Sequence, residues 1–105
     1  MIYEIRTYDL VPRSVPEFEK RSAAMIEGRA KYSQVGGFWS TEVGPLNQVV
    51  HIWPYEDLNQ RADIRGKAVA DGAWPPDNSE FMLNMQSDIY LPAPFMTPLG
   101  EREIG

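Results

Sequence analysis

Apolar positions along the chain recur with two different spacings, which predict four strands and two helices. The four predicted strands are 2–10, 38–43, 49–53 and 86–91. Between them, apolar residues three and four positions apart predict two helices, which begin at Ser14 and at Asp57. The order strand, helix, strand, strand, helix, strand predicts an α+β fold of the ferredoxin-like type, a four-stranded antiparallel sheet with both helices on one face.

Both predicted helices have capping residues at their first turns. Ser14 and Glu17 have the spacing of a capping box, in which side chains bond the free backbone N–H groups of a helix start, and Asp57 and Gln60 repeat it. Gly72 is expected to end the second helix. The buried side of that helix is expected to be formed by Leu58, Ala62, Ala68 and Val69.

A turn at 44–47 is expected to join the second and third strands into a hairpin. With this turn, Ser40 is predicted to lie opposite His51. Pro54 has no N–H to donate to a neighbouring strand, so regular pairing is expected to end at Trp53.

Side chains alternate across a strand, so the sheet offers two sets of residues. The set expected to lie under the helices is Tyr3, Ile5, Trp39, Val50 and Ile52. The set expected to be left uncovered mixes aromatic and charged groups: Arg6, Tyr8, Phe38, Ser40, Glu42, Val49, His51 and Trp53. Because a monomer rarely exposes so many aromatic residues, a second copy is expected to cover this face, which gives a homodimer that encloses a barrel.

Composition narrows the possible functions. The chain has 105 residues, a net charge of −5, no cysteine and one histidine, which fits a single domain over 1–105. Without clustered Lys and Arg, a nucleic-acid partner is not expected. Zero cysteines exclude disulfides and thiolate metal sites, and no metal-ligand spacing is found. The apolar runs are too short to span a membrane and the start lacks a signal-peptide pattern, so a cytoplasmic protein is expected.

Several segments together resemble one family. The residues that carry the resemblance are 4–8, 44–47, 50–53, Tyr55, Leu58, Arg61, Arg65, Trp74 and 94–99. They resemble the NIPSNAP family over nearly the whole chain. The resemblance implies a dimeric α+β barrel, related in fold to cofactor-free monooxygenases and to haem-degrading or haem-dependent enzymes. Pro54 and the pair at 96–97 depart from the family pattern.

Three residues are candidates for catalysis. His51 is the strongest, because an imidazole with an ordinary pKa near 6.5 suits a general base at neutral pH, although a buried, hydrogen-bonded histidine without a catalytic role is the more common case. Arg6 and Tyr8 share a strand face and are predicted to orient a ligand beside His51. The alternative for Arg6 is a buried ion pair with Glu4 or Glu42.

A second group of residues is predicted to contact a ligand. It comprises Phe38, Ser40, Glu42, Trp53, Tyr55 and Trp74. Core or interface packing is the competing explanation for the aromatic members. Arg61 and Arg65 follow Asp57 at steps of four, which favours charge pairs along a helix surface over anion binding.

Three functions therefore remain open. The first is a homodimeric barrel that binds a small organic ligand between sheet and helices, with or without cofactor-free monooxygenase-like catalysis. The second is a non-catalytic interaction or scaffold module. The third is a haem-binding barrel with His51 as ligand; otherwise no cofactor is expected.

Overall fold

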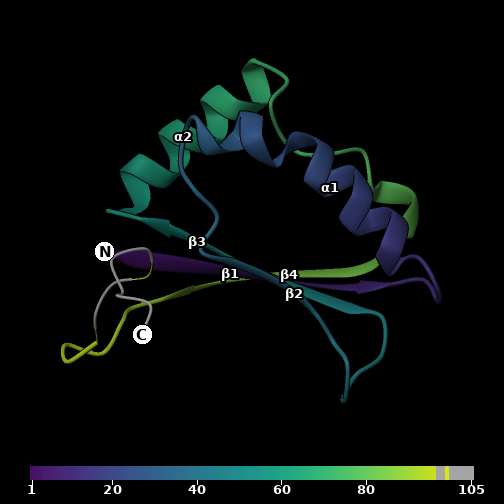
Figure 1. Ribbon diagram of the computed structural model, residues 1–105. Helices are drawn as coiled ribbons and strands as arrows, with labels where there is room; N and C mark the ends of the chain where they lie inside the picture. The colour runs from purple at the N-terminus through teal and green to yellow at the C-terminus, as the bar shows by residue number, and fades with distance from the viewer. Residues whose placement is uncertain (97–98, 100–105) are drawn as a thin grey trace.

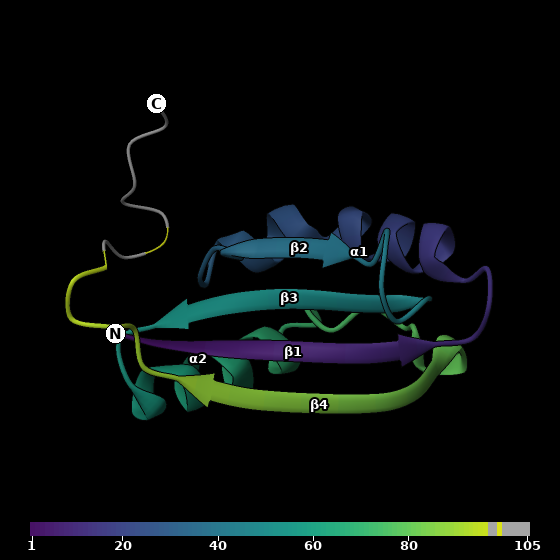
Figure 2. The ribbon, with the colours of Figure 1, turned by 90° about the horizontal axis from the view of Figure 1, so that it is seen from below.

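Two helices cover one face of a four-stranded sheet (Figure 1). The computed structural model describes residues 1–96 and 99. Its elements are β1 Ile2–Leu10, α1 Val15–Ala30, β2 Gly37–Ser40, β3 Gln48–Tyr55, α2 Leu58–Ala70, the short 3₁₀ helix η1 Ser79–Phe81, and β4 Met82–Tyr90. Figure 2 shows the strands in the order β2-β3-β1-β4, and each adjacent pair is antiparallel. The predicted ferredoxin-like α+β fold is confirmed.

The hairpin between β2 and β3 has a longer loop than the sequence suggests. β2 ends at Ser40, and the Thr41 N–H donates to the Gln48 carbonyl across the loop at 2.9 Å. Phe38 therefore lies opposite His51, and Ser40 lies opposite Val49. The predicted register was wrong by two residues. A two-residue shift keeps every side chain on its face of the sheet, so the grouping of residues by face is unaffected.

β3 continues past Pro54, contrary to prediction, and ends at Tyr55. The Gly36 N–H donates to the Ile52 carbonyl at 2.7 Å, so the backbone groups of Ile52, and of Pro54 two residues later, face the β2 side. β2 begins opposite Ile52. Pro54 thus lies beyond the end of its neighbour, where a missing N–H removes no hydrogen bond.

The two predicted helix starts differ in their chemistry. The Asp57 carboxylate accepts from the Gln60 N–H at 2.7 Å, so α2 has the expected cap, and the Gln60 side chain accepts at 2.7 Å from the N–H of Glu56, the residue before the N-cap. Ser14 is the N-cap of α1 but makes no capping bond with its side chain. Its hydroxyl donates instead to the Val11 carbonyl at 2.7 Å.

The two faces of the sheet are exchanged relative to the prediction. The set that contains Arg6, Tyr8, His51 and Trp53 lies under the chain's own helices, and the set that contains Trp39 lies on the open face. The helices cover the aromatic and charged set because each directs a suitable side chain at it. α1 packs Phe18 against the aromatic residues, and α2 directs Arg61 and Arg65 at the Glu4 carboxylate. The prediction that a second copy covers the His51 face was therefore wrong, because the chain's own helices bury it.

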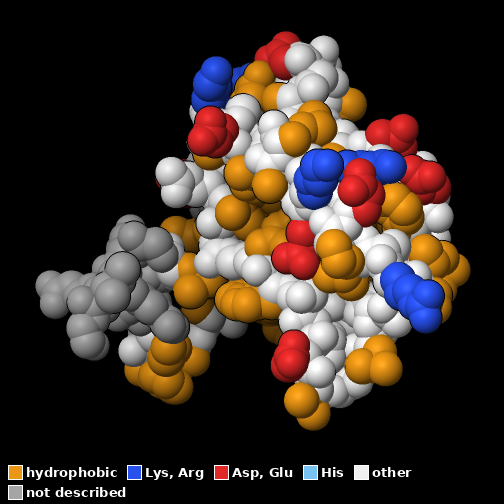
Figure 3. All heavy atoms as spheres, turned by 45° about the vertical axis from the view of Figure 1, so that its right-hand side comes forward, with side chains coloured by type: hydrophobic (Ala, Val, Ile, Leu, Met, Phe, Trp, Pro, Cys, Tyr) orange, Lys and Arg blue, Asp and Glu red, His pale blue; other side chains and the backbone are white. Residues whose placement is uncertain are grey.

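The core is an aromatic layer between α1 and the sheet. One cluster joins Tyr8, Leu10, Phe18 and Val49, and a second joins Ile2, Trp53 and Tyr55. Figure 3 shows hydrophobic side chains gathered near the centre of one face of the molecule.

α2 contributes two apolar side chains to the interior, the buried Ala68 and the partly buried Ile64, which packs against the second cluster. Ala68 is its only buried residue among those that the structure describes, whereas Leu58 and Val69 are exposed. The buried side predicted for this helix was wrong except at Ala68. Its inward face instead carries Arg61 and Arg65, which reach a carboxylate on β1.

Candidate functional site

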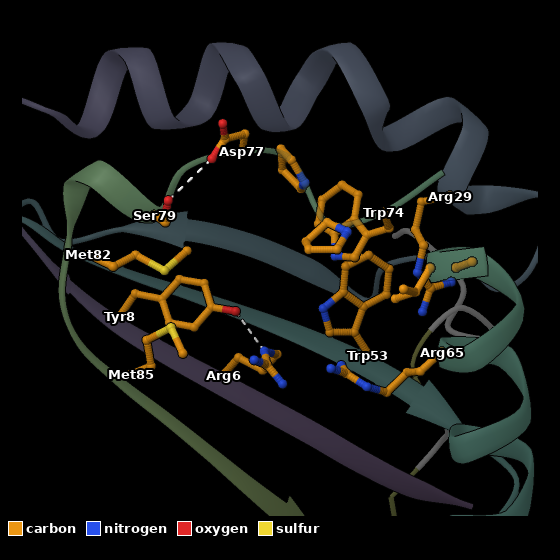
Figure 4. A pocket seen from close by; sticks show the side chains of 14 residues that line it. Arg6, Tyr8, Arg29, Trp53, Arg65, Trp74, Asp77, Ser79, Met82 and Met85 are labelled. Carbon is orange, nitrogen blue, oxygen red and sulfur yellow. Dashed lines mark hydrogen bonds between the residues drawn. The ribbon is translucent and has the colours of Figure 1, made fainter. Parts of the chain in front are cut away.

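A cavity of about 440 Å³ lies between the sheet and α2 and is bordered by the loop that follows α2 (Figure 4). Its volume is in the range of small-molecule sites. The walls come from β1, β3, β4, both helices and residues 74–79. The lining residues are Arg6, Tyr8, Arg29, Trp53, Arg65, Ala68, Val69, Trp74, Pro75, Pro76, Asp77, Ser79, Met82 and Met85.

The floor of the cavity rests on a buried carboxylate. Glu4 is fully buried, accepts hydrogen bonds from Arg6 at 3.0 Å and from Arg61 at 2.9 and 3.1 Å, and forms an ion pair with Arg65 at 3.5 Å. The Ser87 hydroxyl on β4 also donates to it. Two strands and α2 are therefore tied to one carboxyl group.

The surroundings of Glu4 keep it ionised. Burial alone would raise the pKa of this carboxyl, but hydrogen bonds from Arg61 and Ser87 and the nearby charges of Arg65 and Arg6 outweigh burial and lower it from 4.5 to about 2. The carboxylate in turn raises the pKa of Arg61. Arg6 and Arg65 line the cavity while their charges are partly neutralised from below.

Arg29 is the exception among the cavity's cations. It extends from α1, is only 2% exposed, and places its guanidinium 4.4 Å from the centre of the Trp53 ring. Its hydrogen bonds go to neutral oxygens, to the Tyr55 hydroxyl at 2.9 Å and to Ser33 at 2.9 and 3.2 Å. It has no ion pair with a carboxylate in the described part of the chain. Burial lowers the pKa of Arg29.

Arg6 and Tyr8 form a fixed pair on β1. The Arg6 Nε–H donates to the Tyr8 hydroxyl at 2.7 Å, as drawn in Figure 4, and the same guanidinium reaches Glu4. The ion pair between Arg6 and Glu4 is the one that the sequence offered as the alternative to a ligand contact. Arg6 and Tyr8 nevertheless both line the cavity.

His51 lies behind this wall and is held on three sides. Its ring stacks on Phe38 with centres 4.8 Å apart and meets Tyr8 edge-on at 5.1 Å, while its Nδ1 accepts from the Trp53 indole N–H at 2.7 Å. Burial, with the charge of Arg6, lowers the pKa of His51 from 6.5 to about 3. The imidazole is therefore neutral at pH 7.

The hydrogen bond from Trp53 decides which nitrogen of His51 carries the proton. An indole N–H can only donate, so Nδ1 is the acceptor and the proton of the neutral ring is on Nε2. A general base or an axial haem ligand would need a free lone pair on Nε2. The geometry fits neither role, and His51 is arranged as a hydrogen-bond donor.

The residues predicted for the site separate into three groups. Arg6, Tyr8, Trp53 and Trp74 line the cavity, and Phe38 and His51 line a small pocket that adjoins it. Tyr55 is buried behind Trp53 and contacts Arg29. The predictions for Ser40 and Glu42 were wrong in position, since Ser40 is exposed at the end of β2 and Glu42 lies in the exposed loop 41–47.

Sequence reasoning missed several lining residues. Arg29 lies on the same buried side of α1 as Phe18 and Ser22. A basic residue on the side of a helix that faces the core was therefore the sequence feature that could have identified it. Asn78, Met82 and Met85 gave no comparable signal, because only the folded chain brings the loop after α2 and β4 beside β1.

Comparisons with known proteins agree on one family. A family model described as NIPSNAP matches residues 3–97. The chain is 43% identical over 70 residues to Protein NipSnap homolog 3B of Homo sapiens, covering 66% of this chain and 28% of that protein. It is 30% identical over 86 residues to Protein NipSnap homolog of Dictyostelium discoideum, covering 82% and 39%. The match thus spans well under half of these relatives.

Solved structures show the same fold. An uncharacterized NIPSNAP domain protein from Burkholderia xenovorans is 32% identical, with a TM-score of 0.84 over 93% of this chain and 100% of that chain. A NIPSNAP family protein of unknown function from Agrobacterium tumefaciens is 34% identical, with a TM-score of 0.84 over 94% and 93%. A putative antibiotic biosynthesis monooxygenase from Nitrosomonas europaea is 13% identical, with a TM-score of 0.70 over 88% and 98%, a likeness of fold alone.

No helix among residues 1–96 has the length and hydropathy to cross a membrane. Within the same part of the chain, no group of three or more His, Cys, Asp or Glu side chains is arranged to hold a metal ion.

Replacing Glu4 tests its network. Because the unfolded chain binds the Glu4 proton near pH 4.5 and the folded chain only near pH 2, ionised Glu4 stabilises the fold above pH 4.5, and this contribution is lost as the pH falls toward 2. It amounts to about 3 kcal/mol. Glu4→Gln should flatten the loss of unfolding free energy between these pH values and cost roughly 3–5 kcal/mol at pH 7. Denaturant titration at several pH values measures the unfolding free energy at pH 7 and its loss in acid. The control Glu17→Gln removes an exposed ion pair with Arg21 and should change neither quantity. If Glu4→Gln loses unfolding free energy in acid as steeply as the wild-type protein, the proposed role of the network is contradicted.

The titration of His51 tests whether its imidazole is buried away from water. In native protein without a histidine tag, its ring signals should show no protonation between pH 8 and pH 5, because burial and Arg6 lower its pKa to about 3. In urea the same residue should titrate near 6.5. The chain's only histidine makes the NMR assignment unambiguous. A native midpoint between 6 and 7 would show that the ring is solvated.

Proposed function

The chain belongs to the NIPSNAP family, and we propose that this member binds a small organic anion with an aromatic or apolar body in the cavity between its sheet and its helices. The observation that carries the proposal is Arg29, a buried cation at the cavity wall whose hydrogen bonds all go to neutral oxygens. Burying a charge is costly unless an opposite charge compensates it. An anion in the cavity would supply that compensation.

The charges around the cavity support an anionic ligand. Three guanidiniums line it, those of Arg6, Arg29 and Arg65, against one carboxylate, Asp77. In Figure 4, Arg29 and Arg65 lie at the end beside Trp53, whereas Asp77 and Ser79 lie at the opposite end. A ligand carboxylate is therefore expected near Arg29, where guanidinium geometry allows paired hydrogen bonds.

The remaining walls support an apolar body for the ligand. Trp53 and Trp74 meet edge-on with ring centres 5.5 Å apart, and Met82 and Met85 lie across from them. Aromatic faces and flexible thioethers both accommodate planar apolar groups. In this proposal Tyr8 and Arg6 contact the ligand from β1, and the aromatic wall excludes water.

A base-catalysed oxygenase reaction has less support. The fold is shared with a putative antibiotic biosynthesis monooxygenase, but fold does not specify chemistry. Deprotonating a phenol requires a proton acceptor, and His51 offers a donor at Nε2 while its Nδ1 is occupied by Trp53. Haem binding through His51 lacks support for the same reason. The proposal is therefore limited to ligand binding.

Matched acid and amide probes test the anion site. Phenylacetate should bind about tenfold more tightly than phenylacetamide, because only the acid compensates Arg29. Trp53 and Trp74 fluorescence can report binding in a Trp39→Phe background. Arg29→Met should remove the preference for the acid, and Arg29→Lys should keep part of it.

The control for this experiment is Lys20→Met, which removes one exposed positive charge from the same helix and should keep the full preference. Equal binding of acid and amide by the wild-type protein would overturn the anion site. Failure of both probes to bind would favour the non-catalytic interaction module.

We also propose that the chain forms a homodimer through its open sheet face. Apolar Ile5, Val50 and Ile52 lie in the middle of this face, and Trp39 and Tyr90 are 53% and 54% exposed beside them. An apolar surface of this kind usually marks an interface. Loop 41–47 and segment 91–96 extend below the two ends of the sheet (Figure 1), where they can flank a second copy related by a two-fold axis.

Disrupting the open face tests the dimer. Sedimentation equilibrium of the wild-type protein at micromolar concentration should give twice the 12.0 kDa chain mass. Trp39→Glu should give the monomer, because it places a charge in the apolar interface. Leu58→Glu makes the same kind of change at an exposed apolar residue of α2 that is 58% exposed, and should remain dimeric. A monomeric wild-type protein would refute the proposal.

A further inference from the structure

A second, much smaller pocket adjoins the main cavity and shares part of its wall. Its volume is about 20 Å³, enough for one water molecule or one hydroxyl group. Tyr8, Trp74, Pro75, Pro76 and Met82 line both spaces. The residues that only the small pocket has are Phe18, Ser22, Phe38, His51 and Asn78. The side pocket and the main cavity are therefore adjacent.

Two polar atoms in the side pocket have no hydrogen-bond partner in the described part of the chain. They are Nε2 of His51 and Oδ1 of Asn78, and the two residues are 2% and 1% exposed. The hydroxyls of Tyr8 and Ser22 also line the pocket but make no hydrogen bond to either atom, and the remaining lining side chains are aromatic or apolar. Buried polar atoms of folded proteins are almost always hydrogen-bonded, and two exceptions in one pocket indicate a missing partner.

The two atoms have opposite hydrogen-bonding character. Nε2 of His51 is a donor, since Trp53 occupies Nδ1. The Asn78 amide nitrogen donates toward the Phe18 carbonyl and the Ser22 hydroxyl, each at 3.4 Å. Exchanging the amide atoms would direct Oδ1 at the Phe18 carbonyl, so Oδ1 is the atom left free, and it is an acceptor.

We infer that the side pocket is a hydroxyl subsite, which takes one neutral O–H group that accepts from Nε2–H of His51 and donates to Oδ1 of Asn78. Carbonyl, ether and carboxylate oxygens satisfy only the histidine, and an ammonium satisfies only the asparagine. In combination with the proposed function, on which this extension rests, the ligand class is a hydroxylated aromatic acid. Its hydroxyl would lie in the side pocket and its carboxylate near Arg29.

Neutral probes test the subsite separately from the anion site. In tag-free protein labelled with ¹⁵N-histidine, titration with phenol, anisole and toluene should shift the Nε2–H signal of His51 most for phenol. Phenol should bind about tenfold more tightly than anisole, which accepts but cannot donate. Phenol carries no carboxylate, so its binding does not depend on Arg29.

Two variants assign the preference to the pocket. Asn78→Leu should reduce the advantage of phenol over anisole to within about twofold, because the acceptor is lost. Asn84→Leu, the same change at an exposed position on β4, should leave the advantage intact. His51→Phe should act like Asn78→Leu. If either cavity variant fails to fold, the other variant and the wild-type titration still decide.

The possible outcomes separate the two proposals. Hydroxyl-selective binding of phenol, with no preference for phenylacetate over its amide, would support the subsite and overturn the anion site. Equal affinities for phenol and anisole, with no shift at Nε2, would show that the pocket holds only an ordered water and would overturn the subsite. Absence of binding by all three neutral probes would overturn it as well.

Discussion

The fully buried carboxylate of Glu4 is the interaction on which the arrangement of this molecule depends. Ala68 is the only fully buried residue among those described on α2, and Ile64, which packs on the core, is only partly buried, so the apolar contact between this 13-residue helix and the sheet is small. Arg61 and Arg65 provide the attachment by reaching from α2 to Glu4, while Ser87 joins β4 to the same group. A buried ion network is often no more stabilising than an apolar contact of equal volume. Here it fixes where α2 lies.

This mode of attachment also leaves room for the cavity. Arg61 and Arg65 reach from α2 to Glu4 on β1, and the cavity lies between α2 and the sheet, with Arg65 in its lining. The helix contributes only Arg65, Ala68 and Val69 to the lining. The network therefore holds α2 in place, and it places two cations at the cavity, Arg6 and Arg65, that are already partly neutralised. Arg29, which comes from the other helix, lacks that neutralisation, and this difference gives one end of the cavity a preference for anions.

Strand alternation predicted correctly which residues share a face but not which face the helices cover. The sequence shows Tyr3, Ile5 and Ile52 as the more apolar set, and burial of apolar surface favoured placing the helices there. The outcome is opposite because two partners of Glu4, Arg61 and Arg65, come from positions on α2 that no local pattern connects to β1. The cap at Asp57 was predictable because it is local, within four residues. The capping box expected at Ser14 does not form, and the Ser14 hydroxyl donates to the Val11 carbonyl.

His51 shows how far a residue type can mislead about chemistry. A lone histidine among aromatic residues suggests a base, yet the indole N–H of Trp53, two residues along the same strand face, fixes the proton on Nε2 and makes the ring a donor. Burial removes the charged form as well. Such a histidine can still distinguish ligands. In the proposed subsite a hydroxyl group pairs with both the Nε2–H donor of His51 and the Oδ1 acceptor of Asn78, whereas a group that only donates or only accepts leaves one of these atoms unpaired. Selectivity of this kind needs no proton transfer, and it follows from the same aromatic packing that stabilises the core.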